Sequence, residues 1–158
     1  MSEKDLSEAI KNSQVIFICV GTPTKKNSNA ADLSQVFNVA KEIGKFIKSF
    51  KIIVTKSTVP VTTGDKIEKI LLKNAKRKNF SVISNPEFLR EGDAINDFFF
   101  PDRIVIGTSD KRTNKLMHSL YAPLLSKGAK YVNSSRRGAE LIKYASNAFL
   151  ATKITFIN

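Results

Sequence analysis

Residues 15–20 read Val15-Ile16-Phe17-Ile18-Cys19-Val20, an unbroken apolar run that ends at Gly21-Thr22-Pro23-Thr24. A run that is apolar at every position, rather than at alternate positions, is typical of a strand that is buried on both faces. Such strands occur in parallel sheets with helices on both sides. The stretch therefore predicts an α/β fold, with a loop at the carboxyl end of this strand.

Strand-like and helix-like segments alternate along the rest of the chain. The further predicted strands are Lys51–Thr55, Phe80–Ser84, Ile104–Ile106 and Ala129–Val132. The predicted helices are Leu6–Lys11, a segment from Asp32 as N-cap to about Phe50, Thr63–Lys76, Asp93–Phe98, Asp110–Leu125, and a long final helix capped by Ser134. This order predicts a parallel sheet covered by helices.

The composition allows one ordinary core and restricts the class of protein. The chain has 158 residues, 42% of them hydrophobic, and no apolar run approaches the length of a membrane-spanning helix. The single cysteine, Cys19, excludes an internal disulfide, so we expect a cytoplasmic protein. The net charge of +12 comes mostly from lysines spread over predicted helix faces, which is typical of a solvated surface. We therefore expect neither nucleic acid nor a membrane as a partner.

The predicted strand that ends at Ser84 leads into Asn85-Pro86-Glu87-Phe88-Leu89-Arg90-Glu91-Gly92-Asp93-Ala94-Ile95. Ligands of open α/β sheets bind at the carboxyl ends of the strands, where this loop begins. Glu87 and Glu91 share a side if the loop forms a helical turn, and paired carboxylates can divide acid–base roles. The alternative is an exposed acidic turn beside Arg90.

Hydroxyl groups follow two other predicted strands. Gly21 and Thr22 could let a ligand approach the backbone and bond to phosphate or ribose oxygens, or they could form a plain turn. Ser57 and Thr58 offer donors at the same edge, although on local evidence alone a helix N-terminal region before Thr63 is the better explanation.

Lys143 and Asn147 lie four residues apart on the predicted final helix and therefore share a face. An ammonium and an amide placed together can stabilise an oxyanion, whereas the alternative is an ordinary surface lysine. Cys19 is expected to be a small apolar side chain inside its strand and not a nucleophile. His118 has no evident metal-binding partners, so no metal site is expected.

Together these segments resemble the UDP-glucose/GDP-mannose dehydrogenase family, and within it the UDP-glucose 6-dehydrogenases. The resemblance covers nearly the whole chain in the family's order. It rests on Val20–Thr24, Lys56–Pro60, Asn85–Ile95, Pro101–Gly107 and Glu140–Lys153.

The resemblance implies an NAD-dependent enzyme that oxidises the C6 alcohol of a UDP-sugar to a carboxylate in two hydride transfers, with a cysteine that holds the intermediate. It implies NAD contacts from Gly21, Thr22, Ser57, Thr58 and Glu91. It implies that Glu87, assisted by Thr58, acts catalytically as an acid–base or a water-organising residue. It implies that Lys143 and Asn147 are catalytic at the developing oxyanion. The residues implied to contact the UDP-sugar are Glu87, Phe88, Leu89, Arg90, Lys143 and Asn147.

The resemblance also predicts that this chain is an internal fragment. Residues 1–133 would be the C-terminal part of the NAD-binding domain, a partial Rossmann-like sheet, and residues 134–158 the start of the family's long central helix. The glycine-rich loop and the cysteine segment of the family are absent, and Thr62 stands where the family commonly has glycine. The resemblance implies a dimer in the intact family. Because those two segments are absent, we expect this fragment to be inactive alone or to need complementary fragments.

Two other functions remain open at this stage. The chain could be a non-catalytic assembly module, or the product of a decayed gene, that pairs through the apolar face of the final helix, formed by Leu141, Ala145, Ala148 and Phe149. A basic nucleic-acid binder is the weaker alternative.

Overall fold

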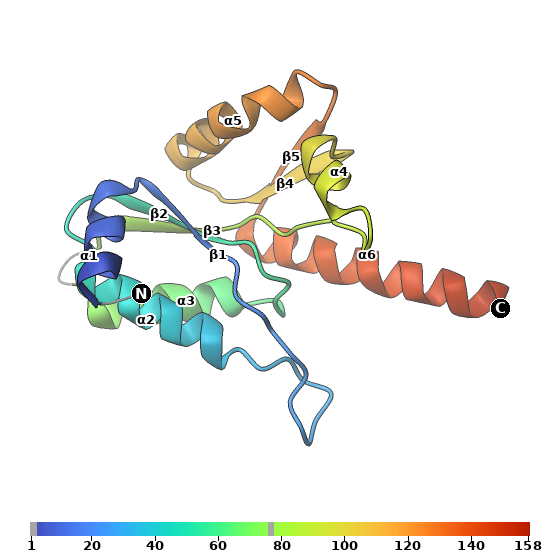
Figure 1. The fold of residues 1–158 in the computed structure, drawn as a ribbon, viewed down its shortest axis with the longest axis horizontal. Helices are drawn as coiled ribbons and strands as arrows, with labels where there is room; N and C mark the ends of the chain where they lie inside the picture. The colour runs from blue at the N-terminus through green and yellow to red at the C-terminus, as the bar shows by residue number, and fades with distance from the viewer. Residues whose placement is uncertain (1–2, 76–77) are drawn as a thin grey trace.

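A computed structural model describes residues 3–75 and 78–158 and contains one five-stranded sheet with helices on its two faces (Figure 1). The α/β prediction is therefore confirmed. The strands are β1 (Val15–Ile18), β2 (Lys51–Thr55), β3 (Phe80–Ser84), β4 (Arg103–Gly107) and β5 (Lys130–Ser134). The helices are α1 (Glu3–Asn12), α2 (Ser34–Phe46), α3 (Thr63–Asn74), α4 (Ala94–Phe99), α5 (Lys111–Leu125) and α6 (Arg136–Ile157).

The strands lie in the order β1-β2-β3-β4-β5, and every neighbouring pair is parallel except β3 and β4. The expectation of a wholly parallel sheet is wrong at this pair. A parallel neighbour requires a long crossover to the opposite end of the sheet. The connection after β3 instead contains the short helix α4, and β4 returns from the carboxyl end of β3, so that Gly107 pairs with Ser84.

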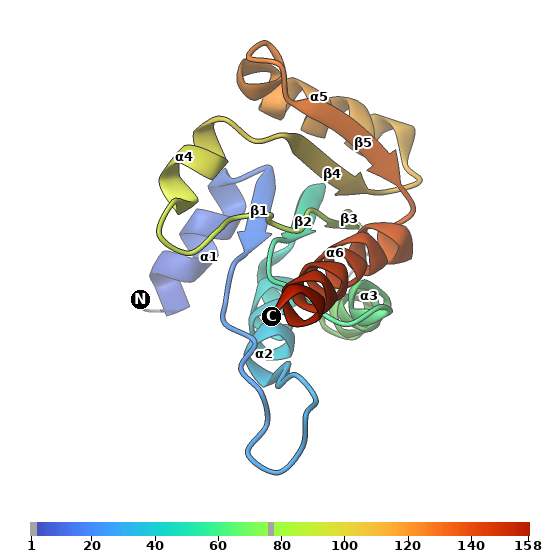
Figure 2. The ribbon, with the colours of Figure 1, turned by 90° about the vertical axis from the view of Figure 1, so that its right-hand side faces the viewer.

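Alternate residues of the central strands face two separate cores. Ile53 and Val82 pack with α2 and α3 on one side, whereas Ile52, Val54 and Ile83 pack with α5 on the other. Figures 1 and 2 show these helix layers on opposite faces. Each fully buried Ile or Val contributes about 1.5–3 kcal/mol relative to an exposed side chain. The two cores hold the carboxyl ends of β1, β2 and β3 at one edge.

Several predicted boundaries differ from the structure. The helix expected to reach about Phe50 ends at Phe46, because Ile47 turns to an extended conformation. Asp32 accepts a hydrogen bond from the Ser34 N–H at 2.9 Å, but the N-cap position belongs to Leu33. The helix expected to end at Lys76 ends at Asn74, because Ala75 is extended, and Lys76 itself lies outside the described residues.

The cap of α6 is Ser135 and not the predicted Ser134. The Ser135 hydroxyl accepts a hydrogen bond from the Gly138 N–H at 3.0 Å. Ser134 is the last residue of β5, where it pairs with Gly107. The strand was predicted to end at Val132 but continues two residues further, through Ser134, so the cap falls on Ser135.

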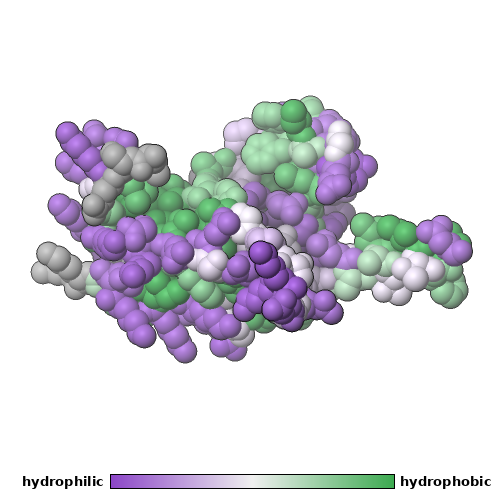
Figure 3. All heavy atoms as spheres, turned by 60° about the horizontal axis from the view of Figure 1, so that its bottom comes forward, coloured by the Kyte–Doolittle hydropathy of each residue, from purple (hydrophilic) through white to green (hydrophobic). Residues whose placement is uncertain are grey.

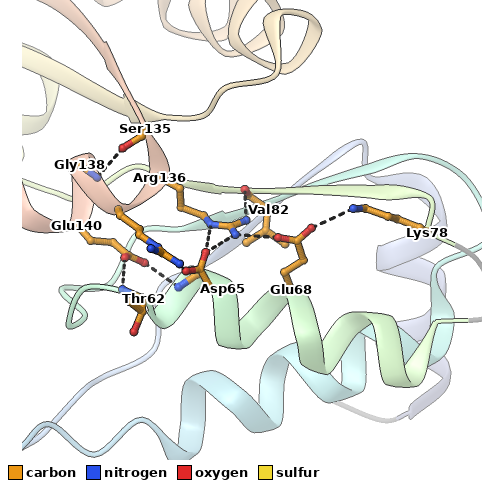
Figure 4. Close-up of polar contacts among 11 residues, drawn as sticks. Thr62, Asp65, Glu68, Lys78, Val82, Ser135, Arg136, Gly138 and Glu140 are labelled. Atoms are coloured by element: carbon orange, nitrogen blue, oxygen red, sulfur yellow. Dashed lines mark hydrogen bonds and ion pairs between the residues drawn. The ribbon is translucent and has the colours of Figure 1, made fainter.

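The start of α6 is bound to the start of α3 by buried and partly buried charges (Figure 4). The Glu140 carboxylate, which is 2% exposed, accepts the N–H groups of Thr62 and Gly64, each at 2.7 Å. Arg136 bonds to Asp65 and Glu68 of α3 and donates to the Val82 carbonyl of β3 at 3.1 Å. We refer to these contacts of Arg136 and Glu140 as the α3–α6 clasp.

Two glycines, Gly64 in α3 and Gly107 in β4, allow the start of α6 to lie close to these two elements. A Cβ atom at Gly64 would lie 2.5 Å from the Arg136 side chain, and one at Gly107 would lie 2.6 Å from the Ala139 Cβ. Beyond the clasp, α6 projects away from the sheet, and the hydrophobic side chains at its end are visible in the space-filling view (Figure 3). The clasp therefore fixes α6 at one end.

Thr62, which precedes α3, has φ = 79° and is the one non-glycine residue with positive φ in the described part of the chain. This left-handed conformation costs a residue with a Cβ about 1–2 kcal/mol, whereas the greater freedom of unfolded glycine costs about 0.5–1 kcal/mol. The positive φ therefore explains why glycine, which the family commonly has here, suits position 62.

We predict that T62G raises the free energy of unfolding by about 0.5–1 kcal/mol, because it relieves this strain. Urea denaturation measures the change. V61G is the matched control, since Val61 lacks positive φ, and it should lower stability. A loss of stability in T62G as large as that in V61G would contradict the interpretation.

Candidate functional site

The loops that follow β1, β2 and β3 are joined by hydrogen bonds at the edge where the three strands end. The Thr22 hydroxyl donates to the Thr58 carbonyl at 3.0 Å, and the Ser57 hydroxyl donates to the Val20 carbonyl at 2.6 Å. Parallel strands end at one edge, so residues far apart in sequence meet here. The structure thus brings together Thr22, Ser57 and Thr58, as predicted from their positions after strands.

Glu87 is the centre of the candidate site. Its Oε1 accepts from the Thr58 hydroxyl at 3.3 Å and lies 3.1 Å from the Lys143 Nζ. Its Oε2 accepts the Leu89 N–H at 2.7 Å. Partial burial acts to raise the pKa of Glu87, but these donors outweigh it and hold the pKa below its ordinary value. Glu87 is therefore an ionised acceptor at neutral pH.

Lys143 reaches this loop from α6, and only 8% of its side chain is exposed. Arg136, Glu140 and Lys143 follow a spacing of four and then three residues, so they lie on one stripe of the helix. The clasp thereby turns Lys143 toward Glu87. The Lys143 Nζ also lies 5.2 Å from the centre of the Phe88 ring, within the range of a cation–π contact.

The buried side chain of Asn85 holds the start of the loop, a role that the sequence analysis did not assign. Its amide donates to the Val105 carbonyl at 2.9 Å, and its carbonyl oxygen accepts from the Tyr121 hydroxyl. Burial raises the pKa of Tyr121 to about 12, so this hydroxyl remains a donor. The Asn-Pro pair after a strand marks a shaped loop, but the sequence gives no sign of Tyr121 as its partner.

Other predicted residues do not join the group around Glu87. Arg90 is exposed and binds Asp97 and Asp93. Glu91 is exposed as well, and residues 85–90 are not helical, so Glu87 and Glu91 do not form the predicted pair on one side of a helical turn. Asn147 lies one turn beyond Lys143 on α6 and is exposed.

Leu89 is partly exposed beside Arg90, and Gly21 lies at the open end of β1. A Cβ atom added at Gly21 would meet no other atom within 4 Å. The space in front of the first loop is therefore open to a ligand.

A cleft of about 420 Å³ lies beside this site, between the loop after β3 and the segment that leads into β4. It is lined by Lys56, Asn85, Glu87, Phe88, Arg103 and Tyr121 among others. The Arg103 guanidinium stacks on the Phe88 ring, with Cζ 4.5 Å from the ring centre. Lys56 and Arg103 were not predicted as site residues. Both lie in segments that carry the family resemblance, but no role was assigned to either.

The prediction that Cys19 lies inside the first strand is wrong. β1 ends at Ile18, and Cys19 is exposed. Burial nevertheless raises the pKa of the Cys19 thiol, although nearby Lys56 opposes this. His118 is exposed and stacks edge-on against the Tyr131 ring, with 4.8 Å between the ring centres.

Within residues 3–75 and 78–158, no three His, Cys, Asp or Glu side chains lie close enough together to hold a metal ion. No helix in those ranges has the length and apolar character needed to cross a membrane.

Comparison with known proteins gives consistent matches. A UDP-glucose 6-dehydrogenase from Rhizobium meliloti (strain 1021) is 52% identical over 156 residues, which are 98% of this chain and 36% of that protein. A UDP-glucose 6-dehydrogenase from Pseudomonas aeruginosa is 45% identical over 157 residues, which are 97% of this chain and 34% of that protein.

Two solved structures share the fold. A UDP-glucose dehydrogenase from the archaeon Pyrobaculum islandicum superposes with a TM-score of 0.90 at 42% identity, covering 97% of this chain and 35% of that one. A GDP-mannose dehydrogenase from Pseudomonas aeruginosa, solved as a ternary complex, superposes with a TM-score of 0.89 at 39% identity, covering 96% of this chain and 36% of that one.

The chain therefore spans only slightly more than a third of the length of the relatives that it matches. The sequence profile of the NAD binding domain of the UDP-glucose/GDP-mannose dehydrogenase family matches residues 1–125. Because this match covers most of the sequence, the chain belongs to the UDP-glucose/GDP-mannose dehydrogenase family.

Proposed function

We propose that this chain supplies part of the cofactor site and part of the substrate site of an NAD-dependent UDP-sugar 6-dehydrogenase. The reaction would convert UDP-glucose to UDP-glucuronate in two successive hydride transfers. The observation that carries the proposal is the contact of Glu87 with Thr58 and Lys143 at the carboxyl ends of the strands. Relatives of the same family carry the names of UDP-glucose dehydrogenases.

The residues after β1 and β2 fit one end of an NAD molecule. Gly21 leaves open space, and the hydroxyls of Thr22 and Ser57 donate to backbone carbonyls, which leaves their oxygens as acceptors. Gly21, Thr22, Ser57, Thr58 and Glu91 would hold NAD. The cofactor, when bound, accepts the hydride. The sequence has no Gly-x-Gly-x-x-Gly run to bind the pyrophosphate, so we expect weak binding by this chain alone.

Glu87 would organise water more readily than it would carry a proton. A carboxylate with a lowered pKa is a weak base at neutral pH. Oε1 already accepts from two groups and Oε2 from one, so Oε2 retains a site for a water proton. Of the two roles implied by the family resemblance, this geometry favours the water-organising one.

Lys143 would stabilise the oxyanion that develops on the sugar. Its ammonium has three donors, of which Glu87 accepts one, and its burial strengthens the interaction of the others with negative charge. Asn147 would contribute an amide from the next turn of α6. Phe88, Leu89 and Arg90 would line the UDP-sugar together with Glu87.

The structure also supports a second candidate, an assembly module that pairs through α6. The predicted apolar face, formed by Leu141, Ala145, Ala148 and Phe149, is exposed, and apolar residues continue to the end of the helix. An apolar helix face of this kind favours association. Pairing through α6, with a second copy or with complementary fragments, is compatible with the dehydrogenase proposal.

We predict that purified residues 1–158 produce no NADH from UDP-glucose and NAD, because the cysteine segment and the pyrophosphate loop are absent from this sequence. Absorbance at 340 nm measures the product, with an intact family enzyme as the positive control. Adding a polypeptide that carries both missing segments should restore turnover. UDP-glucose-dependent NADH production by the chain alone would overturn the prediction.

We predict that E87Q lowers the free energy of unfolding at pH 7 by about 1–3 kcal/mol, because it leaves the buried Lys143 ammonium without its carboxylate. K143M should lower it less, since Glu87 keeps its bonds to Leu89 and Thr58. Urea denaturation measures both. Equal losses in the two variants would count against this account.

The effect of E87Q should depend on pH. Because the folded-state pKa of Glu87 lies below its ordinary value of 4.5, its stabilising contribution is present above that value and disappears as the pH falls through the folded-state pKa. The difference between E87Q and the unmodified protein should therefore shrink below pH 4.5. A difference that is constant down to pH 3 would indicate that the charge of Glu87 is unimportant.

A further inference from the structure

Lys56 has a charge for which the described part of the chain provides no direct partner. It follows β2 immediately, is partly buried, and lines the 420 Å³ cleft. Within residues 3–75 and 78–158, its ammonium has no recorded hydrogen bond or ion pair. A partly buried ammonium without an acceptor is costly, so this position calls for a partner from outside the chain.

The carboxylates that line the cleft are largely committed to other cations. Glu87 accepts from Lys143, Thr58 and Leu89, and Asp97 binds Arg90. Glu87 attracts Lys56 at longer range, but Lys143 and Arg103 add positive charge around the same space. Asp102 also lines the cleft and offsets part of that charge.

The second cation available in the cleft is Arg103. Its guanidinium lies over the Phe88 ring, and no ion pair is recorded for it among the described residues. The ring fixes the guanidinium at the wall of the cleft, where its planar donor fork suits phosphate or carboxylate oxygens. Lys56 supplies a point charge and Arg103 supplies directed donors.

We propose that this cleft contains an oxyanion subsite, in which Lys56 and Arg103 bind the phosphate or carboxylate group of a small ligand. The volume of the cleft falls in the range of small-molecule sites, about 300–1,000 Å³. Pro86, Phe88 and Pro101 line it as well and provide an apolar wall for the rest of such a ligand. Glu87, Phe88, Leu89 and Arg90, which are proposed above to contact the UDP-sugar, also line this cleft, so the inference rests on and extends that proposed site. Binding to this chain can be measured without NAD or turnover.

The electrostatics of Lys56 agree with this geometry. Burial lowers the pKa of the Lys56 ammonium, and Glu87 and Cys19 only partly oppose the effect. A bound oxyanion would supply the missing opposite charge. Because of the same burial, we expect Lys56 to contribute little to folding as an isolated charge.

The test is a titration of ¹⁵N-labelled protein with sodium phosphate and, separately, with sodium acetate, at an ionic strength held constant with sodium chloride. We expect saturable chemical-shift changes at the amides of Lys56, Glu87, Phe88 and Tyr121. Tighter binding of phosphate would identify a phosphoryl group as the preferred ligand, and tighter binding of acetate would identify a carboxylate.

Three variants make the titration specific. K56M should weaken binding at least tenfold, K56R should keep it within about threefold because the charge remains, and K41M, on the exposed surface of α2, should leave it unchanged. The urea midpoint of K56M should equal or exceed that of the unmodified protein. A K56M variant that binds as tightly as the unmodified protein, or shifts spread evenly over surface lysines, would overturn the proposal, as would a lowered midpoint.

Discussion

The buried carboxylate of Glu140 at the start of α3 is the interaction on which the rest of the site depends. The first N–H groups of a helix lack partners within the helix, and a side chain just before the helix usually satisfies them. Thr62 provides no such side-chain cap. Glu140 accepts the N–H groups of Thr62 and Gly64 instead, from a position more than seventy residues further along the chain.

This arrangement carries an electrostatic cost as well as a gain. Burial raises the pKa of Glu140, while the two N–H donors and Arg136 act in the opposite direction. The positive end of the α3 dipole and the Arg136 guanidinium make an ionised carboxylate tolerable there. In return, the rotation of α6 about its axis is fixed. Lys143, one turn further along the same stripe, is thereby held against Glu87. Asn147 follows on the same stripe, where it is exposed.

Much of this fold could be predicted from local sequence patterns, and the exceptions have physical explanations. Apolar runs such as Lys51–Thr55 are strands because both of their faces are buried. The reversed direction of β4 depends on the path of the chain between Asn85 and Asp102, which periodicity does not encode. The helix cap shifts from Ser134 to Ser135 because Ser134 belongs to β5, where it pairs with Gly107.

The site was predictable to a similar extent. The positions of Thr58 and Glu87 after neighbouring strands place them at one edge, and the family resemblance pairs them with Lys143. The bonds of Asn85 to Tyr121 and of Glu140 to Gly64 join distant segments, so no local pattern indicates them. Lys56 escaped notice because its unpartnered ammonium becomes evident only once the cleft around it is formed.

The central claim is that the α3–α6 clasp holds Lys143 in position to keep Glu87 ionised. The most direct measurement is an NMR pH titration of the Glu87 side-chain carboxyl in the unmodified protein, in the folded double variant R136A/E140A, and in L141A as a control on the exposed side of α6. The account predicts a pKa below the ordinary value in the unmodified protein and in L141A, and a rise toward the ordinary value in the double variant. An unchanged pKa of Glu87 in R136A/E140A would contradict it.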